Sequence, residues 1–306
     1  MLLMSLLCFL CVVISLDSAH GQRFSILPSP EPEVINETVG IPLHLHYTNR
    51  EDNGMETWHS MNSENGLRIS YYDDSAWDSV FSKFLFLVSK NTSFFNTLLN
   101  IEKTDLFRYL ITFINGGIYA DSDVTCLKPA NEWLLEFGIE NTTLSNLDFL
   151  FGVEFNKPQT HYSFIGPLPI QISQFTFGIA KGSVMMKEIL FNVGRAIETI
   201  PVSKKTVLER TGPAIFTKTI LETIGRFSHP TGCDEKGYPY ALMSVSMLND
   251  HGQVLHLFKD GKTFSGVMLP YRAFSFHPLH GSKKSAALTQ HSFEGSWRLG
   301  KRKKGG

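Results

Sequence analysis

TDLFRYLITFINGGIYADSDVTCLKP, residues 104–129, is the most informative segment of this 306-residue chain. Its first half places hydrophobic side chains at helical spacing, which predicts a helix with a buried stripe of Leu106, Tyr109, Leu110 and Phe113. Gly116 and Gly117 follow, and glycine is typical of a helix end that needs a left-handed residue. Residues 118–124 then predict a strand, so the segment indicates a helix, a tight stop and a strand.

Asp121 and Asp123 come at the end of this predicted strand, where alternate side chains point to the same side. In an extended segment their Cα atoms would lie about 7 Å apart, which is wide for two direct ligands of one small ion. We therefore expect one carboxylate to bind an ion directly and the other to act through water or a sugar hydroxyl. Mn²⁺ and Mg²⁺ combine carboxylates with phosphate oxygens, so the pair suits a metal-bridged diphosphate. A solvated turn is the alternative.

Asp105 and Arg108 precede this pair on one face of the predicted helix, three residues apart. The order Asp-x-x-Arg, Gly-Gly-Ile-Tyr, Asp-x-Asp resembles the core motif of the DxD-containing sugar transferases, which include the fungal initiation-specific α-1,6-mannosyltransferases. The resemblance implies that Asp105, Arg108 and Tyr119 bind the sugar donor. It also implies that Asp121 and Asp123 are the catalytic, metal-binding carboxylates. A surface ion pair is the alternative for Asp105 and Arg108.

The resemblance covers most of residues 41–297, and its opening motif comes early. IPLHLHYT, residues 41–48, is similar to the family's Ile-Pro-x-x-x-His-x-Thr, which implies that His46 and Thr48 contact the donor. For His46 the alternative is a core histidine bonded to the backbone. Relatives commonly carry a Trp where this chain has Asn49, and in some of them it stacks on the nucleobase. Tyr47 is a candidate to replace it.

The closing motif is HSFEGSW, which begins at His291 and resembles the family's His-x-x-x-Gly-Ser-Trp. A neutral imidazole is a good ligand for Mn²⁺, so the resemblance makes His291 a third metal ligand. A hydroxyl and an indole N–H are suitable donors to phosphate oxygens, so Ser296 and Trp297 are expected to bind the donor diphosphate. A surface histidine is the alternative for His291.

Three other segments match the family in part. SQFTFGIAK, residues 173–181, resembles its Gln-Trp-Thr segment, with Phe175 in place of the Trp. RTGP, residues 210–213, resembles its Thr-Gly-Pro before a helix, whose start would suit an anion or a sugar unless it is a simple helix N-terminus. Glu154 either faces the site, since relatives have an acidic residue near this position, or is a surface charge at a strand end.

Predicted strands alternate with predicted helices along the chain. The strands cover residues 41–48, 67–72, 118–124, 148–154, 173–181 and 267–278, and the helices cover 77–87, 104–115, 184–197 and 207–224. This order predicts an α/β fold with a mostly parallel sheet, in which ligands bind outside the carboxyl ends of the strands. The resemblance narrows it to a glycosyltransferase-A (Rossmann-like) fold, a mostly parallel sheet flanked by helices in a single domain.

The composition is that of a globular protein. The chain is 42% hydrophobic and 19% charged with a net charge of −1, so it can bury a full core, and no nucleic acid is expected as a partner. We predict a glycosyltransferase domain over residues 41–300. It follows a proline-containing stem or linker over residues 22–40 and precedes a basic tail over residues 301–306.

The N-terminus predicts entry into the secretory lumen. Residues 1–16 are almost wholly apolar but shorter than the roughly 20 residues of a spanning helix, and small residues follow at a suitable cleavage position. Residues 1–21 are therefore a signal peptide or a short signal anchor, and an anchor would attach the chain to a membrane through residues 1–16. The Golgi is the expected compartment, with the endoplasmic reticulum as the alternative.

The sequons agree with such a compartment, and the two cysteines outside the leader leave their state open. Cys126 and Cys233 form either one disulfide or two separate buried thiols. Acceptor sequons for N-glycosylation begin at Asn36, Asn91 and Asn141.

The family resemblance implies a retaining hexosyltransferase that depends on Mn²⁺ (or Mg²⁺). The reaction that the resemblance favours is transfer of mannose from GDP-mannose to a glycan, as in protein N-linked glycosylation. Relatives that use UDP-sugars or inositol phosphoceramide leave another donor and a glycolipid acceptor open. A non-catalytic glycan- or nucleotide-sugar-binding protein is the alternative from another class. Donor base, sugar, acceptor and linkage stay open at this stage.

Overall fold

The computed structural model describes residues 40–49, 52, 54–77, 79–81, 93–156, 170–227, 252–259, 262–271, 273–274 and 287–292. All of them belong to one compact unit, Ile35–Gly306, and the other unit, Met1–Val34, lies outside them. The predictions made for the leader, the stem and the basic tail therefore fall outside the described residues. So do those for Ser296, Trp297, Cys233, Asn36 and Asn91.

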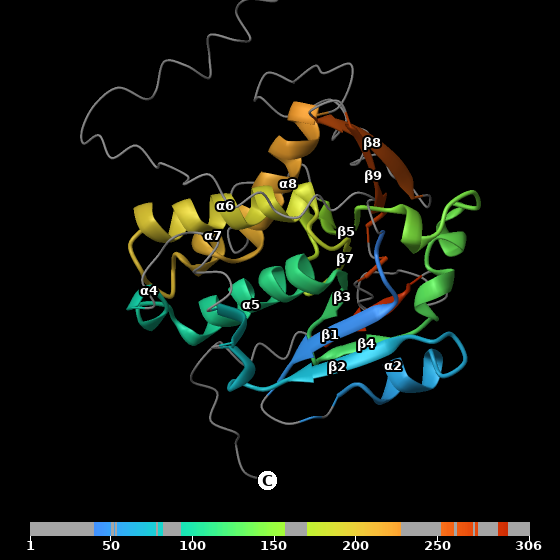
Figure 1. Ribbon diagram of the computed structural model, residues 1–306, viewed down its shortest axis with the longest axis horizontal. Helices are drawn as coiled ribbons and strands as arrows, with labels where there is room; N and C mark the ends of the chain where they lie inside the picture. Colours follow the sequence, from blue (N-terminus) through green and yellow to red (C-terminus); the bar gives the residue numbers. More distant parts are fainter. Residues whose placement is uncertain are drawn as a thin grey trace, which may run out of the picture. The chain divides into compact units, whose positions relative to one another are not determined.

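The described residues form an eight-stranded sheet, in the order β2–β1–β3–β7–β5–β9–β8, with β6 paired to β5 (Figure 1). The strands are β1 (His44–Thr48), β2 (Arg68–Tyr72), β3 (Gly117–Ala120), β5 (Phe149–Asn156), β6 (Ile170–Ile172), β7 (Thr176–Ile179), β8 (Gln253–Lys259) and β9 (Lys262–Leu269). β1, β2, β3, β5 and β9 run in one direction, and β6, β7 and β8 run against them. The predicted α/β fold with a mostly parallel sheet is confirmed, with β7 inserted antiparallel between β3 and β5.

Helices and apolar side chains cover the sheet. The helices are α2 (Glu56–Met61), α4 (Ser93–Asn96), α5 (Asn100–Asn115), α6 (Val184–Thr199), α7 (Val207–Arg210) and α8 (Pro213–Phe227). Figure 1 shows α5, α6, α7 and α8 gathered on one side of the sheet. Phe149 and Phe151 of β5 pack in one buried cluster and Leu150 in a second one, as expected where alternate side chains face opposite sides of a strand. Both faces of the sheet are therefore buried.

The junction between α5 and β3 follows the sequence prediction. α5 ends at Asn115, and Gly116 and Gly117 have φ values of 69° and 113°. A Cβ on Gly117 would lie 2.3 Å from the carbonyl oxygen of His44, so β1 and the start of β3 approach more closely than a side chain permits. The glycine pair therefore fixes both the end of the helix and the position of β3.

The structure corrects several predicted strand and helix limits. β3 ends at Ala120, so the strand predicted over residues 118–124 is wrong in its second half. Residues 121–124 form a turn in which the Val124 N–H donates to the Asp121 carbonyl oxygen (3.0 Å). β4 (Val124–Cys126) then leaves the main sheet and pairs antiparallel with β10 (Thr289–His291).

The other limits differ for local reasons. The helix predicted over 207–224 is broken into α7 and α8, since Pro213 disfavours a helical residue before it and begins α8. The strand predicted over 173–181 is regular only in β7, and that over 267–278 ends at Leu269 with β9.

Cys126 and Asn141, which the sequence singled out, lie within the described residues. Cys126 is a free, buried thiol whose Sγ donates to the Lys128 carbonyl oxygen (3.2 Å), and burial raises its pKa to about 11. Asn141 is exposed, as a glycosylation acceptor would be. Among the described residues, none of the helices has the length and apolar character needed to cross a bilayer.

Candidate metal and sugar-donor site

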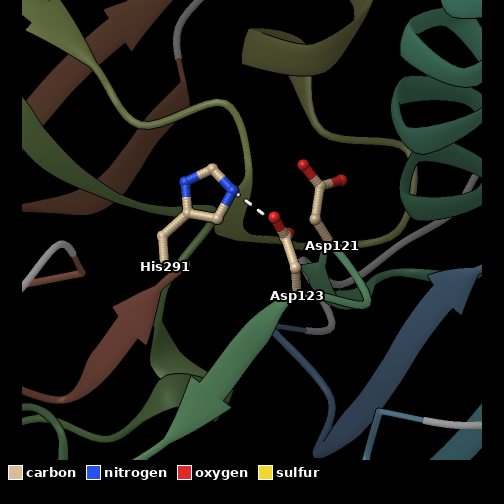
Figure 2. Close-up of side chains that lie close together, drawn as sticks. All are labelled: Asp121, Asp123 and His291. Carbon is tan, nitrogen blue, oxygen red and sulfur yellow. Dashed lines mark ion pairs between the residues drawn. The ribbon is translucent and has the colours of Figure 1, made fainter. Parts of the chain in front are cut away.

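Asp121, Asp123 and His291 come together beside the turn after β3 (Figure 2). One oxygen of each carboxylate and one ring nitrogen of His291 all lie within 4.8 Å of one another. His291 Nε2 is 3.1 Å from Asp123 Oδ1, and all three side chains are partly exposed. Two carboxylates and an imidazole fit a divalent cation such as Mn²⁺, which accepts both kinds of ligand.

The pairing of β4 with β10 explains how His291 reaches the aspartates. His291 lies directly opposite Val124 in this two-stranded ladder, and the Ser292 N–H donates to the Asp123 carbonyl oxygen (3.1 Å). The turn at residues 121–124 replaces the extended segment expected from the sequence, so the estimate that the carboxylates stand too far apart for one ion does not apply. Both aspartates can approach a single cation.

Asp121 also belongs to a second group of side chains. Its Oδ1 accepts a hydrogen bond from the Tyr119 hydroxyl (2.9 Å) and lies 3.4 Å from Arg108 Nη1. Its backbone N–H donates to the carbonyl oxygen of Phe175 (2.9 Å). One carboxylate oxygen is therefore engaged on the Arg108 side, which suits Asp121 to an indirect or single-oxygen contact with the ion.

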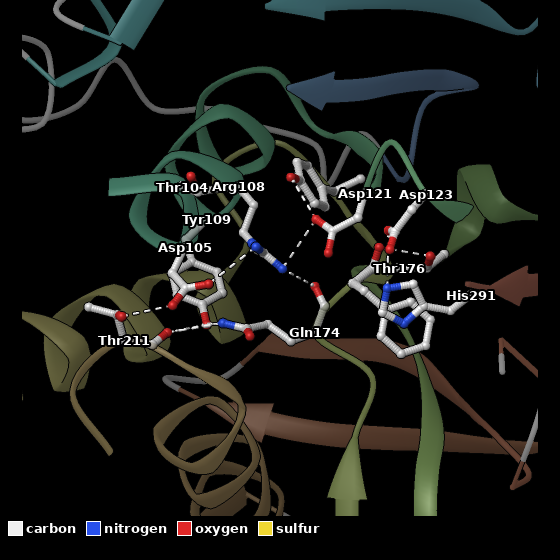
Figure 3. Close-up of polar contacts among 12 residues, drawn as sticks. Thr104, Asp105, Arg108, Tyr109, Asp121, Asp123, Gln174, Thr176, Thr211 and His291 are labelled. Carbon is white, nitrogen blue, oxygen red and sulfur yellow. Dashed lines mark hydrogen bonds and ion pairs between the residues drawn. The ribbon is translucent and has the colours of Figure 1, made fainter. Parts of the chain in front are cut away.

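Arg108 and Asp105 form a buried ion pair (Figure 3), so their interpretation as a surface pair is wrong. Arg108 Nη2 lies 3.2 Å from Asp105 Oδ1, and the two side chains are 5% and 4% exposed. Burial alone would lower the pKa of Arg108, but the nearby acidic groups, Asp121 foremost, outweigh it and raise the pKa, so the guanidinium stays charged.

Asp105 lies in a less favourable electrostatic position. Burial raises its pKa to about 7, even though the Arg108 charge and a hydrogen bond from Thr211 Oγ1 to Asp105 Oδ2 (2.8 Å) act in the opposite direction. The carboxyl group therefore titrates close to neutral pH, in contact with the guanidinium that joins it to Asp121.

Gln174 and Phe175 link the Asp105–Arg108 pair to the cluster of Asp121, Asp123 and His291. These contacts were not part of the sequence prediction. The Gln174 carbonyl oxygen accepts from Arg108 Nη1 (3.2 Å), and its side-chain amide donates to the Thr211 carbonyl oxygen (3.0 Å) and to the Tyr109 hydroxyl. Tyr109 in turn donates to the same Thr211 oxygen (2.8 Å). Gln174 is 6% exposed, and the available indication was its place in the segment that resembles the family's Gln-Trp-Thr.

His46 and Thr48 lie behind the site on β1. His46 is fully buried, donates from Nε2 to the Gly116 carbonyl oxygen (2.9 Å), and accepts at Nδ1 from the Tyr72 hydroxyl (3.1 Å). Burial lowers its pKa to about 3, so the ring is neutral. Thr48 Oγ1 donates to the Tyr72 carbonyl oxygen (2.9 Å). The bond to Gly116 holds β1 against the start of β3, and the two bonds to Tyr72 hold β1 against β2. Donor binding by either residue stays a prediction.

Tyr47 does not offer an open aromatic face. Its side chain is 1% exposed, packs in the buried cluster with Trp58 and Trp133, and donates from its hydroxyl to Asp52. The idea that Tyr47 takes the place of a base-stacking tryptophan is therefore wrong for this structure.

Glu154 lies on β5, within the strand's irregular part. The register between β5 and β6 shifts at this residue, and a bulge of this kind re-aims a side chain. Gln171 Nε2 donates to its Oε2 (2.8 Å). Burial raises the pKa of Glu154, the Gln171 bond and the His291 charge lower it, and Asp121 raises it. The carboxyl group is thus within electrostatic reach of two cluster members, which favours the site-facing interpretation over a surface charge.

Comparisons with known proteins agree with this geometry. Residues 45–137 match the family described as "Glycosyltransferase sugar-binding region containing DXD motif". The chain is 27% identical to an initiation-specific α-1,6-mannosyltransferase of Schizosaccharomyces pombe, over 65% of this chain and 48% of that protein. It is 28% identical to one of Candida albicans, over 65% and 54%. The chain thus spans about half the length of these two relatives.

More distant matches share shorter or weaker similarity. An inositol phosphoceramide mannosyltransferase of S. pombe is 29% identical over 35% of each chain. A solved structure, PaToxG glycosyltransferase, aligns with a TM-score of 0.37 and 16% identity over 60% of this chain and 69% of that one.

The matched segment holds the buried Asp105–Arg108 pair and both aspartates of the cluster. Residues 45–137 are thus similar to the sugar-binding region of the DXD-containing glycosyltransferases, and the chain resembles the fungal initiation-specific α-1,6-mannosyltransferases.

Proposed function

We propose that this protein is a metal-dependent glycosyltransferase that moves a hexose from a nucleotide-sugar to a glycan or glycolipid acceptor. The observation that carries the proposal is that the Asp121 carboxylate joins the candidate metal cluster to the buried Asp105–Arg108 pair. Asp121 belongs to the cluster with Asp123 and His291, and its Oδ1 also lies 3.4 Å from the Arg108 of the buried pair. A cation site next to hydrogen-bonding groups for a sugar is what a nucleotide-sugar donor requires.

In this proposal one set of residues binds the metal ion and the diphosphate, and another set binds the sugar. Asp123, His291 and Asp121 would hold Mn²⁺ or Mg²⁺, which neutralises charge on the departing nucleoside diphosphate when bound. Arg108 keeps its charge beside Asp121 and orients that carboxylate. Binding of sugar hydroxyls by Asp105 and Arg108 is proposed from the resemblance to the family. Ser296 and Trp297 are proposed to donate to phosphate oxygens. Retention of the anomeric configuration is part of the proposal.

Mannose from GDP-mannose is the proposed donor, because the relatives with the longest matches are named α-1,6-mannosyltransferases. The match to an inositol phosphoceramide mannosyltransferase keeps a glycolipid acceptor as the alternative to an N-linked glycan. A UDP-sugar is the alternative donor. We further propose a secretory-pathway location in the Golgi, with residues 1–16 as a signal sequence or membrane anchor.

The test is hydrolysis of a panel of sugar nucleotides by the purified protein, with Mn²⁺ and with EDTA. We expect release of GDP from GDP-mannose in the presence of Mn²⁺ and loss of this activity in EDTA. Hydrolysis of a UDP-sugar instead would change the donor. Binding of a sugar nucleotide without any hydrolysis, with glycan acceptors also supplied, would favour a non-catalytic binding protein and overturn the proposal.

A further inference from the structure

Phe175 contacts the metal cluster from the protein side. Its ring stacks on the imidazole of His291, with ring centroids 4.1 Å apart and planes inclined by 26°. Its carbonyl oxygen accepts from the backbone N–H of Asp121 (2.9 Å). One residue therefore touches the histidine through its side chain and an aspartate through its backbone.

The surroundings of Phe175 are apolar and tightly bounded. Its side chain is 5% exposed and belongs to the buried cluster that contains Ala120 and Val124, which flank the Asp-Ser-Asp turn, and Leu288, which precedes β10. This packing therefore involves residues next to the Asp-Ser-Asp turn and next to β10, the two segments that carry the three ligand side chains. A shell of this kind controls the orientation of ligands and the access of water to a metal.

His291 benefits from such support. Its side chain is 12% exposed and is carried by β10, a strand of three residues that pairs with β4. In Figure 2 the ring is turned so that one nitrogen faces Asp123, the nitrogen that lies 3.1 Å from Asp123 Oδ1. An imidazole must keep this plane to act as a ligand, and a flat aromatic surface against one face restricts its rotation.

We propose that Phe175 is a positioning residue of the metal centre, whose ring holds His291 in the orientation that aims Nε2 at the ion. The inference rests on the metal centre of the proposed function and adds a residue that acts through a ligand rather than on the ion. It gives a role to the aromatic residue between Gln174, whose carbonyl oxygen accepts a hydrogen bond from Arg108, and the start of β7.

The experiment measures binding of Mn²⁺ alone to the metal-free protein, by titration calorimetry and by electron paramagnetic resonance of the free ion. We expect Phe175→Leu to weaken Mn²⁺ binding by about tenfold, the lower end of the effect of removing support from a metal ligand. Phe175→Tyr and Phe175→Trp keep a flat ring and should retain the wild-type affinity. Phe175→Met serves as the non-aromatic variant if the leucine variant does not fold.

Two controls separate positioning from a general loss of packing. Phe264→Leu removes an equally buried ring, 5% exposed, which packs edge-on against Phe227 at 6.2 Å, and it should leave Mn²⁺ affinity unchanged. In a His291→Ala background, Phe175→Leu should cause no further loss of affinity, because the ring acts through the imidazole. In metal-free wild-type protein, the ring protons of His291 should show an upfield ring-current shift that Phe175→Leu removes.

The outcomes are distinct. Unchanged Mn²⁺ affinity in Phe175→Leu would overturn the role of Phe175 while leaving the metal centre in place. An equal loss in the His291→Ala background would also overturn it, since the effect would not pass through the histidine. Wild-type protein that binds no Mn²⁺ would sink both this inference and the metal dependence of the proposed function.

Discussion

Arg108 serves two carboxylates from a position that solvent hardly reaches. Its guanidinium lies 3.2 Å from Asp105 Oδ1 and 3.4 Å from Asp121 Oδ1, with 5% of its side chain exposed. A buried charge of this kind stabilises only while its partners remain, because each isolated charge would be costly in the protein interior. Any change at Arg108 therefore acts on the fold as well as on the site.

Arg108→Ala should destabilise the protein by up to about 3 kcal/mol above pH 7, where Asp105 is ionised and would be left buried without its cation, and by less at lower pH, where Asp105 is protonated. Urea unfolding gives the measurement. The same substitution in an Asp105→Asn background should cost clearly less, because no buried carboxylate is then left unpaired. Equal costs in the two backgrounds would mean that the ion pair contributes little. Donor binding by Arg108 is therefore better tested with Arg108→Lys.

Asp105 should make stability depend on pH near neutrality. Its pKa is raised from 3.8 to about 7 in the folded protein, so at intermediate pH the folded state holds a proton that the unfolded chain has lost. The stability linked to this proton is fully present below pH 3.8 and is lost as pH rises through about 7.

The difference in unfolding free energy between wild type and Asp105→Asn isolates this effect. We expect wild type to lose stability relative to Asp105→Asn as pH rises from 3.8 through about 7, in the direction set by the raised pKa. Parallel pH profiles for the two proteins would show that Asp105 titrates at its ordinary pKa.

Asp123→Asn should abolish metal-dependent hydrolysis of the donor and leave the fold intact. Asp123 lies in the turn after β3 with 18% of its side chain exposed, so no core packing depends on it. Circular dichroism and thermal unfolding check the fold. Asp74→Asn, at an exposed turn after β2, is the matched control and should keep full activity. Full activity in Asp123→Asn would remove this carboxylate from the site.

At the scale of elements, the connection from α5 to β3 places the aspartates. Gly117 combines a φ of 113° with a backbone oxygen 2.3 Å from where a Cβ would be. Gly66 has a φ of 71° in open space, with no atom within 4 Å of the place that a Cβ would take. Gly66 therefore shows the cost of a left-handed conformation alone, whereas Gly117 adds a φ further from the left-handed helical region and a close backbone contact.

Gly66→Ala should cost about 1 kcal/mol, the strain of a left-handed non-glycine residue. Gly117→Ala should cost about 2–4 kcal/mol, because the methyl group must also push β1 away from β3. Denaturant unfolding of both variants tests the comparison. Equal costs would show that β1 can shift without penalty.

The sequence revealed this element because its determinants are local. The apolar period of α5 and the two glycines predict the helix, its end and the following strand from neighbouring residues alone. The turn at Asp121 is not predictable in this way, because its geometry depends on the pairing of β4 with β10, which joins distant parts of the chain. The stacking of Phe175 on His291 and the bonds of Gln174 are hidden for the same reason.

The sequence pattern also could not show that the charged side chains of Asp105 and Arg108 are buried. Asp105 and Arg108 are polar residues on a helix, where solvent exposure is the ordinary expectation. In the structure α5 is covered by β7 and by α7, and both side chains become interior groups. The antiparallel insertion of β7 between β3 and β5 likewise follows from tertiary pairing, although the α/β class itself was clear from the order of elements.

At the scale of the whole molecule, a bound cation should stabilise the fold. An ion that binds only the folded state adds about 2.7 kcal/mol when its free concentration is about 100 times Kd. We expect Mn²⁺ to raise the Tm of wild type and EDTA to reverse the rise. Asp123→Asn should show no shift with Mn²⁺. An equal shift in that variant would place the ion elsewhere.

The pairing of β4 with β10 also sets an order in time. The ribosome makes the two aspartates long before it makes His291, so at about 5–20 residues per second the third ligand follows on the order of ten seconds later. Until then a nascent chain offers a cation only two carboxylates in an unfinished loop. The complete set of three candidate ligands would therefore assemble only after the late strand β10 has been made and has paired with β4.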